Sequence, residues 1–219
     1  MMAVFAKGER LRHIGHLDIQ RAVQRALRRS GLPVSYSKGF NPHILVAFAS
    51  ALSTGASGER ELMDVTLEEE VSPERFVEAM NRALPPDLQL KEARPLEERH
   101  PALMAQVAAA EYSIRLLERA GALTADLPGF LAQETIMAIR KTKSGEKEVD
   151  CKPLIFSLTA ENDTLHTVMK LTETESCKPD MLIKALSAWA GVEPPRVMIC
   201  RNRLLGLDPD GHLAPLETL

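Results

Sequence analysis

The sequence is poor in aromatic side chains, which make up 4% of its 219 residues and include one Trp and two Tyr. This scarcity excludes a surface that binds single-stranded nucleic acid through many stacked rings, so we expect any contact with RNA to lean mainly on charge and backbone. Cysteines are also few. Cys151, Cys177 and Cys200 are widely spaced and form no Cys-x-x-Cys pair. This pattern predicts free thiols in a reducing compartment and argues against a disulfide framework or a zinc knuckle.

The motifs that hold common cofactors are missing as well. The chain has no Cys-x-x-x-Cys-x-x-Cys triad for a radical SAM iron–sulfur cluster. It also has neither the Gly-x-x-x-x-Gly-Lys-Ser/Thr phosphate loop nor the Gly-x-Gly-x-x-Gly fingerprint of dinucleotide sites, and the glycines at Gly55 and Gly58 indicate only a turn. We therefore expect neither a cofactor nor a metal site in this chain.

Long apolar runs are absent too. No run reaches the roughly 18 residues that a membrane span requires, and charges at Lys7, Glu9 and Arg10 interrupt the N-terminal segment where a signal peptide would be apolar. These features predict a cytoplasmic protein that makes no membrane contact.

Hydrophobic residues nevertheless form 45% of the chain, enough for a substantial core. The net charge is only −3, but the charge is unevenly distributed. The segment from Met1 to His43 carries eight basic and two acidic side chains, and the segment from Glu59 to His100 carries twelve acidic and six basic ones. Such polarity suggests one face suited to an anionic partner.

The first half of the chain predicts six elements. The strands span Met2 to Ala6, the two pieces Val34 to Tyr36 and Ile44 to Ser50 with a turn between them, Glu61 to Leu67 and Leu88 to Ala93, and the helices span His16 to Ser30 and Ser72 to Leu84. Gly15 is the expected N-cap of the first helix, and Gly31 with Pro33 is its expected end. The second half predicts the same order, with strands over Glu111 to Leu117, Pro153 to Thr159, Thr164 to Leu171 and Val197 to Leu204, and helices over Asp126 to Arg140 and Pro179 to Ala190.

This order predicts an α+β protein made of two duplicated ferredoxin-like (βαββαβ) halves, residues 1–98 and 103–219, packed as two α/β sandwiches. A linker near Glu97 to Leu103 separates them.

Several motifs in the first half carry a family resemblance. They are Gly15-His16-Leu17-Asp18, the helix ending in Arg28-Arg29-Ser30-Gly31-Leu32-Pro33, the segment Tyr36-Ser37-Lys38-Gly39-Phe40-Asn41-Pro42-His43, and Phe48-Ala49 with Gly55. In order and spacing these resemble an uncharacterised radical-SAM-linked family of bacterial proteins. The resemblance is strongest over Lys7 to Asp64, and Lys141 to Asp150 resembles a second family segment. Gly15 departs from the Ser that usually precedes His-Leu-Asp in the family, which removes a hydroxyl but leaves an N-cap role intact.

The resemblance implies a domain that occurs alone or fused to the C-terminus of a radical SAM protein, often encoded near ribonuclease E/G and ribosomal protein genes, with no established activity. It therefore implies a radical SAM protein as partner and suggests RNA as a second partner.

The helix that begins at His16 is the first candidate site. His16 at its N-terminus, with Arg21, Arg25 and Arg28 along one face, has the chemistry to hold phosphate. The alternative is that Asp18 complements the helix N-terminus and the arginines are an ordinary solvated face.

The segment from Lys38 to His43 is the second candidate. Lys38 is a cation, and His43 has an imidazole suited to proton transfer or phosphate binding. Phe40 is either a stacking platform or a core residue, and His43 alternatively packs against the sheet edge. Lys141 and Lys143 mark a third segment, either a solvent-facing hairpin tip or a mobile arm that follows a phosphate backbone.

Three functions follow from these candidates. The first is a non-catalytic RNA-binding or substrate-presenting module that works with a radical SAM enzyme through Arg21, Arg25, Arg28, Lys38 and His43. The second is an RNA-processing or RNA-modifying enzyme in which His16 or His43 transfers a proton. The third is a protein–protein adaptor, which an exposed apolar patch would favour.

Overall fold

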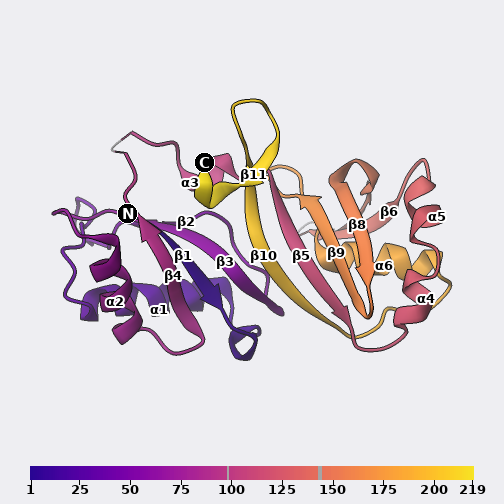
Figure 1. Cartoon of the computed structure of the whole chain (residues 1–219), viewed down its shortest axis with the longest axis horizontal. Coiled ribbons are helices and arrows are strands. Elements are labelled where there is room, and N and C mark those ends of the chain that lie inside the picture. The colour runs from indigo at the N-terminus through magenta and orange to yellow at the C-terminus, as the bar shows by residue number, and fades with distance from the viewer. Residues whose placement is uncertain (98, 143–144) are drawn as a thin grey trace.

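The fold is a mixed α+β arrangement built on one large, mostly antiparallel sheet (Figure 1). It is seen in a computed structural model that describes residues 1–97, 99–142 and 145–219. The sheet has the order β4-β1-β3-β10-β5-β9-β8, with β2 and β11 pairing at its side. It runs without interruption through both halves of the chain, in place of the two separate sandwiches that the sequence predicts.

The first half contains the six expected elements. They are β1 (Met2–Lys7), α1 (His16–Arg29), β2 (Val46–Phe48), β3 (Ala56–Val65), α2 (Pro73–Ala83) and β4 (Leu88–Arg94), with a short 3-10 turn, η1 (Glu9–Leu11), after β1. Their order in the sheet is β4-β1-β3-β2, and each neighbouring pair is antiparallel.

Local signals place both helices of this half. Gly15 is the N-cap of α1, and the chain leaves the helix through Gly31, whose φ of 72° suits glycine. Ser72 caps α2 by accepting a hydrogen bond from the Arg75 amide, and Pro73 occupies the first helical position. Both helices pack their apolar faces on one core with alternate residues of β1, β3 and β4.

The second half contains more elements than expected. They are α3 (Leu103–Gln106), β5 (Ala109–Leu116), α4 (Ala120–Thr124), α5 (Leu127–Ala132), β6 (Met137–Thr142), β7 (Gly145–Asp150), η2 (Lys152–Leu154), β8 (Ile155–Glu161), β9 (Thr164–Lys170), α6 (Pro179–Trp189), β10 (Val197–Leu207), β11 (Leu213–Pro215) and η3 (Leu216–Thr218). Its four long strands follow the order β10-β5-β9-β8, again with antiparallel neighbours.

The predicted helix over Asp126 to Arg140 begins as expected, with Asp126 as its N-cap, but its second half is wrong. A short helix, α5, ends at Ala132, and the chain then enters β6. Ile136 and Ala138 are buried while Met137 and Ile139 are exposed, which is the alternation of a strand. β6 pairs only with β7, as a hairpin separate from the main sheet.

The two halves join through β3 and β10, which pair in parallel from Ile199 opposite Ala56 to Arg201 opposite Gly58. Ser57 adds a hydrogen bond from its Oγ to the Ile199 carbonyl, 3.3 Å long. The last strand of the second half therefore pairs with a strand of the first half, so the expected linker near Glu97 does not separate two independent sheets.

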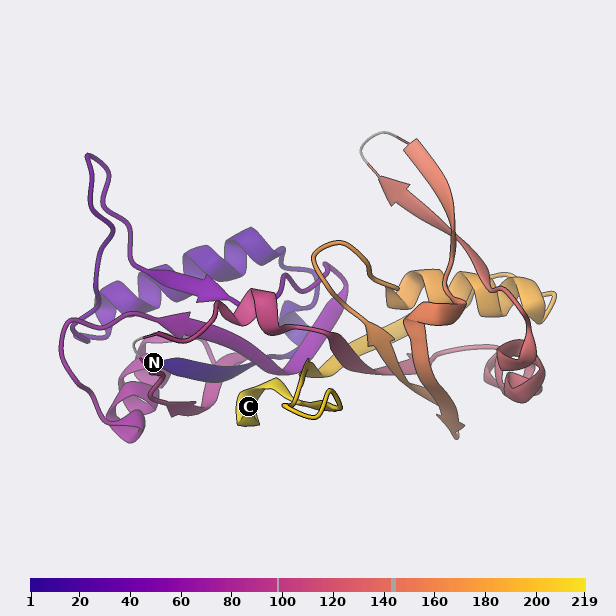
Figure 2. The same cartoon turned by 90° about the horizontal axis from the view of Figure 1, so that it is seen from above.

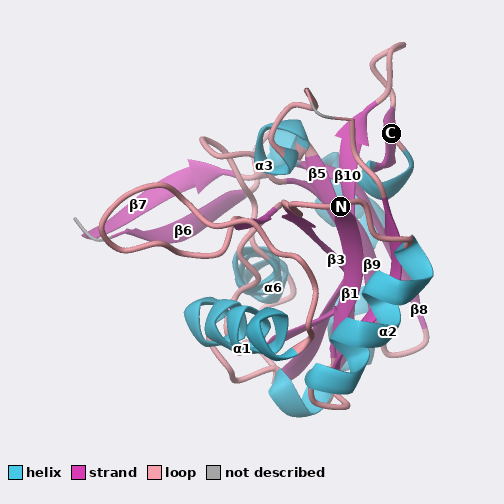
Figure 3. Ribbon diagram, turned by 90° about the vertical axis from the view of Figure 1, so that its left-hand side faces the viewer, coloured by secondary structure: helices cyan, strands magenta, loops and turns pink. Residues whose placement is uncertain are grey.

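Two hairpin-like arms project from the same side of the sheet on which α1 and α6 lie (Figure 2). One arm is the segment from Tyr36 to Ile44, and the other is β6-β7. Figure 3, turned differently, shows α1, α6 and the β6-β7 arm on one side of the strands. In the described part of the chain, no helix has both the length and the apolar character needed to cross a membrane.

Candidate functional site

The exposed face of α1 carries the three arginines that the sequence singled out. Arg21, Arg25 and Arg28 follow one another at helical spacing, and all three are exposed. Arg21 pairs with Asp18 at 2.9 Å, whereas Arg25 and Arg28 form no ion pair with any described residue. The cationic groups of these two residues therefore remain available to an anion.

Lys38 and His43 lie together on the 36–44 loop, the arm that follows α1 and that the isolated bridge between Tyr36 and Ile44 closes. The Ser37 amide donates to the His43 carbonyl at 2.8 Å, and Gly39 turns the chain with a φ of 131°. The loop thus has a defined shape in spite of its exposure.

Ser37 is a partner of His43 that the sequence pattern did not reveal. Its Oγ lies 2.7 Å from His43 Nδ1 and accepts the His43 amide at 3.1 Å. This hydrogen bond occupies Nδ1, and Nε2 bonds to no described residue, so Nε2 is the ring nitrogen open to a ligand. His43 is exposed and does not pack against the sheet edge.

The tip of the 36–44 loop presents an aromatic ring to solvent. Phe40 is 106% exposed and Tyr36 at the base of the loop is 44% exposed, which rules out a core role for Phe40. Lys38, between them in sequence, is also exposed. Proteins in general hold unpaired bases by stacking them on exposed rings and by placing cations near the backbone, and this loop presents one group of each kind.

His16 lies apart from His43. It begins α1, whereas the 36–44 loop follows the other end of that helix. Its half-buried ring meets Phe48 edge to face, with centroids 5.3 Å apart, and lines a small cavity with Lys7 and Glu61. Burial lowers the pKa of His16, and the nearby charges of Arg201 and Lys7 lower it further. The structure therefore does not bring His16 and His43 into one concavity.

Behind His16 lies a buried charged cluster, here called the Lys7–Glu61–Arg201 cluster. Arg201 donates from Nε to Glu61 Oε1 at 2.8 Å and from Nη2 to Glu61 Oε2, and both side chains are almost fully buried. Lys7 Nζ donates to the carbonyls of Arg12, Ile14 and Ala56. The charge of Glu61 and its hydrogen bonds raise the pKa of Arg201, although burial alone acts to lower it.

The sequence offers a weak signal for this cluster. Lys7 ends the apolar strand β1, whereas Glu61 and Arg201 lie near other charged residues of their strands, and Gly58 stands opposite Arg201 in the β3–β10 pair. A Cβ at position 58 would lie 2.7 Å from the Glu61 carboxylate, so glycine there makes room for the ion pair. The three charges lie far apart in sequence, and only the β1–β3–β10 pairing brings them together.

The third predicted segment is described only in part. Lys141 belongs to β6, where its backbone stands opposite that of Glu146 in β7, while Lys143 lies outside the described residues. The prediction of a hairpin for this segment agrees with the β6-β7 arm.

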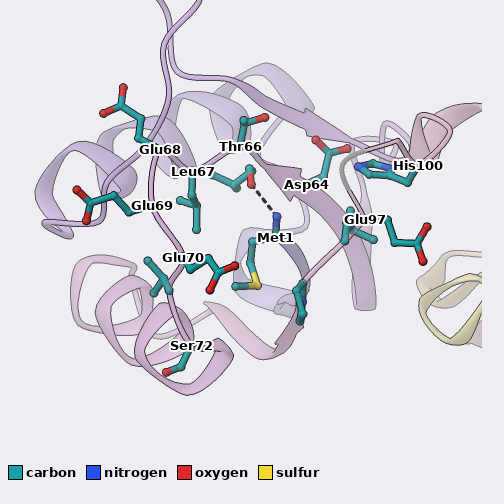
Figure 4. A pocket seen from close by; sticks show the side chains of 14 residues that line it. Met1, Asp64, Thr66, Leu67, Glu68, Glu69, Glu70, Ser72, Glu97 and His100 are labelled. Carbon is teal, nitrogen blue, oxygen red and sulfur yellow. Dashed lines mark hydrogen bonds between the residues drawn. The ribbon is translucent and has the colours of Figure 1, made fainter.

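A large hollow of about 810 Å³ is lined mainly by acidic side chains, whereas the predicted binding residues of α1 and the 36–44 loop are basic (Figure 4). Asp64, Glu68, Glu69, Glu70 and Glu97 line it, and the Met1 amine donates to the Val65 carbonyl at 2.9 Å beside them. Burial raises the pKa of Asp64. Five carboxylates repel a phosphate backbone, so this surface is unsuited to RNA.

Comparison with known proteins identifies the family but no activity. No curated protein matches the chain. A family model described as "Uncharacterized protein conserved in bacteria (DUF2344)" matches residues 1–180, and this description mentions neither a radical SAM enzyme nor RNA. Because the match covers well over half of the sequence, the chain belongs to this uncharacterized bacterial family, DUF2344.

Proposed function

We propose that the protein is an RNA-binding module that uses the exposed face of α1 together with the 36–44 loop. The proposal rests on Arg25 and Arg28 of α1, which are exposed and form no ion pair with any described residue. Helix α1 lies on the side of the sheet from which the loop with Lys38 and Phe40 projects (Figure 2). Arginines there would contact phosphates, and Phe40 would stack on an unpaired base.

In this proposal each half of the chain is a ferredoxin-like unit, and the two duplicated units together support the binding face. The matching strand orders β4-β1-β3-β2 and β10-β5-β9-β8 support the duplication. In this reading the β6-β7 hairpin is an insertion of the second half, and it forms the second arm on the same side.

We further propose that the module acts in the bacterial cytoplasm and presents RNA to a radical SAM enzyme. The family resemblance in the first half of the chain supports this partner. The described cysteines are all free, which is consistent with a reducing compartment.

Fluorescence anisotropy tests the proposal by measuring the affinity for a labelled hairpin RNA with an unpaired loop over a series of salt concentrations. The logarithm of the affinity should fall linearly with the logarithm of the salt concentration. In an Arg25→Gln/Arg28→Gln variant the magnitude of this slope should be smaller by about 1.4 to 1.8, the value for two phosphate contacts. The matched control is Arg75→Gln/Arg82→Gln, which removes two exposed arginines from α2. Absent binding, or equal slopes for both variants, contradicts the proposal.

The contact between Ser37 Oγ and His43 Nδ1 favours a second candidate, an RNA-processing enzyme in which His43 moves a proton. A His43→Asn variant separates the two candidates, since an enzyme would lose turnover of a cleavable RNA while a binding module would keep most of its affinity. Undiminished turnover in this variant removes the second candidate.

A further inference from the structure

A cavity of about 670 Å³ lies where the two halves meet, separate from the basic face of α1. Its lining comes from the loop Ser50 to Thr54, from Tyr112 of β5, from Ile199 and Arg201 of β10, and from Leu171 with the segment Cys177 to Asp180. The loop after β2 and the loop before α6 approach each other near the centre of Figure 2. The volume falls within the range of about 300 to 1,000 Å³ that is typical of small-molecule sites.

The walls of this cavity combine apolar and polar groups. Leu52 and Ile199 supply apolar surface, and the exposed loop residues Ser53 and Thr54 supply hydroxyls. Lys178 and Asp180 are exposed lining residues whose opposite charges offset each other. The lining therefore fits a ligand that has both an apolar body and a polar group.

The loop itself presents donors. Within the described chain, the backbone N–H groups from Ala51 to Thr54 donate to no protein acceptor. Arg201 holds the loop against the sheet, since its Nη1 donates to Ser50 Oγ at 3.1 Å and its Nη2 to the Ser50 carbonyl at 3.3 Å. Gly55 fixes the far end by donating to the Arg12 carbonyl at 2.7 Å.

Positive charge lies behind this loop. The Lys7–Glu61–Arg201 cluster contains two cations and one carboxylate, a net charge of +1, and Lys7 and Arg201 are 2% and 1% exposed. Burial lowers the pKa of His16 most, the charges of Arg201 and Lys7 lower it further, and Glu61 opposes them, so both cations act on a neighbouring group. A buried net positive charge is stabilised by an anion in an adjoining cavity.

We propose that this cavity binds a small organic anion, with its carboxylate or phosphate group at the amides and hydroxyls of the loop Ala51 to Thr54 and its apolar body against Leu52 and Ile199. Arg201 acts as a positioning residue that shapes the loop, and Lys7 supplies the excess charge. The site is independent of RNA binding, so either proposal can fail alone.

Two fluorescent probes with the same rings test the role of charge. Anilinonaphthalene sulfonate carries an anion that stands in for the carboxylate or phosphate, and phenylnaphthylamine has no charge. The full chain should bind the sulfonate at one site at least roughly tenfold more tightly than the neutral probe, as expected for one excess buried charge nearby. Equal affinities for the two probes overturn the proposal.

Variants locate the site. Ser53→Trp should fill the cavity and abolish sulfonate binding, whereas Thr159→Trp, a similar change at an exposed residue of β8, should leave it intact. Lys7→Met should weaken sulfonate binding roughly tenfold and leave the neutral probe unaffected. Circular dichroism shows which variants remain folded. If Lys7→Met does not fold, Ser53→Trp decides, and sulfonate binding that survives this variant overturns the proposal.

Competition identifies the anion. Displacement of the sulfonate by adenosine monophosphate assigns a phosphate ligand, and displacement by indole acetate assigns a carboxylate. Failure of both to displace it overturns the proposal.

Discussion

Removal of the Glu61 carboxylate should be among the most damaging single changes to stability. In Glu61→Ala, the Arg201 guanidinium loses two hydrogen bonds and its counter-charge while it stays buried at 1% exposure. Lys7, which feels the charge of Arg201, adds a second cation to the same interior. Breaking such a buried pair costs about 3 to 5 kcal/mol, because an unpaired charge remains in the core.

Thermal and urea unfolding measure this loss. At about 2 to 4 °C per kcal/mol for a chain of this size, the melting temperature should fall by roughly 6 to 20 °C. The control is Glu78→Ala, which breaks the exposed pair between Glu78 and Arg82 on α2 and should change stability by less than about 1 kcal/mol. A double variant, Glu61→Leu/Arg201→Met, should recover most of the loss because it removes both charges of the broken pair, while Lys7 keeps its three carbonyl acceptors. Similar small losses for Glu61→Ala and Glu78→Ala would refute the reasoning.

Three further predictions concern single residues. Gly58→Ala should lower the free energy of unfolding by about 1 to 3 kcal/mol, since its Cβ would meet the Glu61 side chain at 2.7 Å, and a change below about 0.5 kcal/mol in urea unfolding would contradict this. Phe40→Ala should leave the melting temperature unchanged, because the ring is fully exposed, yet weaken RNA binding by about 1 to 3 kcal/mol in the anisotropy assay. His16 has a pKa below 6.5 in the folded protein, so the unfolded chain binds more protons and stability falls as the pH drops through and below 6.5. The melting temperature of His16→Gln should therefore fall less between pH 7 and pH 5 than that of the parent protein, and parallel curves would contradict this.

Much of the first half could be predicted because its signals are local. Ser72 with Pro73 begins α2, and Gly31 ends α1 through a positive φ. The helical spacing of Arg21, Arg25 and Arg28 likewise places them on one exposed face without any knowledge of tertiary structure.

The segment after Ala132 shows where local signals fail. Ile136 to Ile139 is a short apolar run, and periodicity over so few residues does not distinguish a buried helix from a strand. The pairing of β6 with β7 decides in favour of a strand.

The charged cluster and the cavity depend on long-range pairing. Glu61 and Arg201 meet only because β10 returns across the molecule to lie beside β3. Ser37 and His43 are close in sequence, but their contact depends on the turn at Gly39. A sequence pattern therefore identifies chemically suitable residues more readily than it identifies their partners.

The most direct test of the central claim is a map of the residues that crosslink to bound RNA. Ultraviolet crosslinking in cells, followed by mass spectrometry of the attached peptides, reports the contact surface without assuming a substrate. The proposal predicts crosslinks at Tyr36 and Phe40 of the 36–44 loop and on peptides of α1. Crosslinks confined to other surfaces, or an absence of RNA on the purified protein, would contradict it.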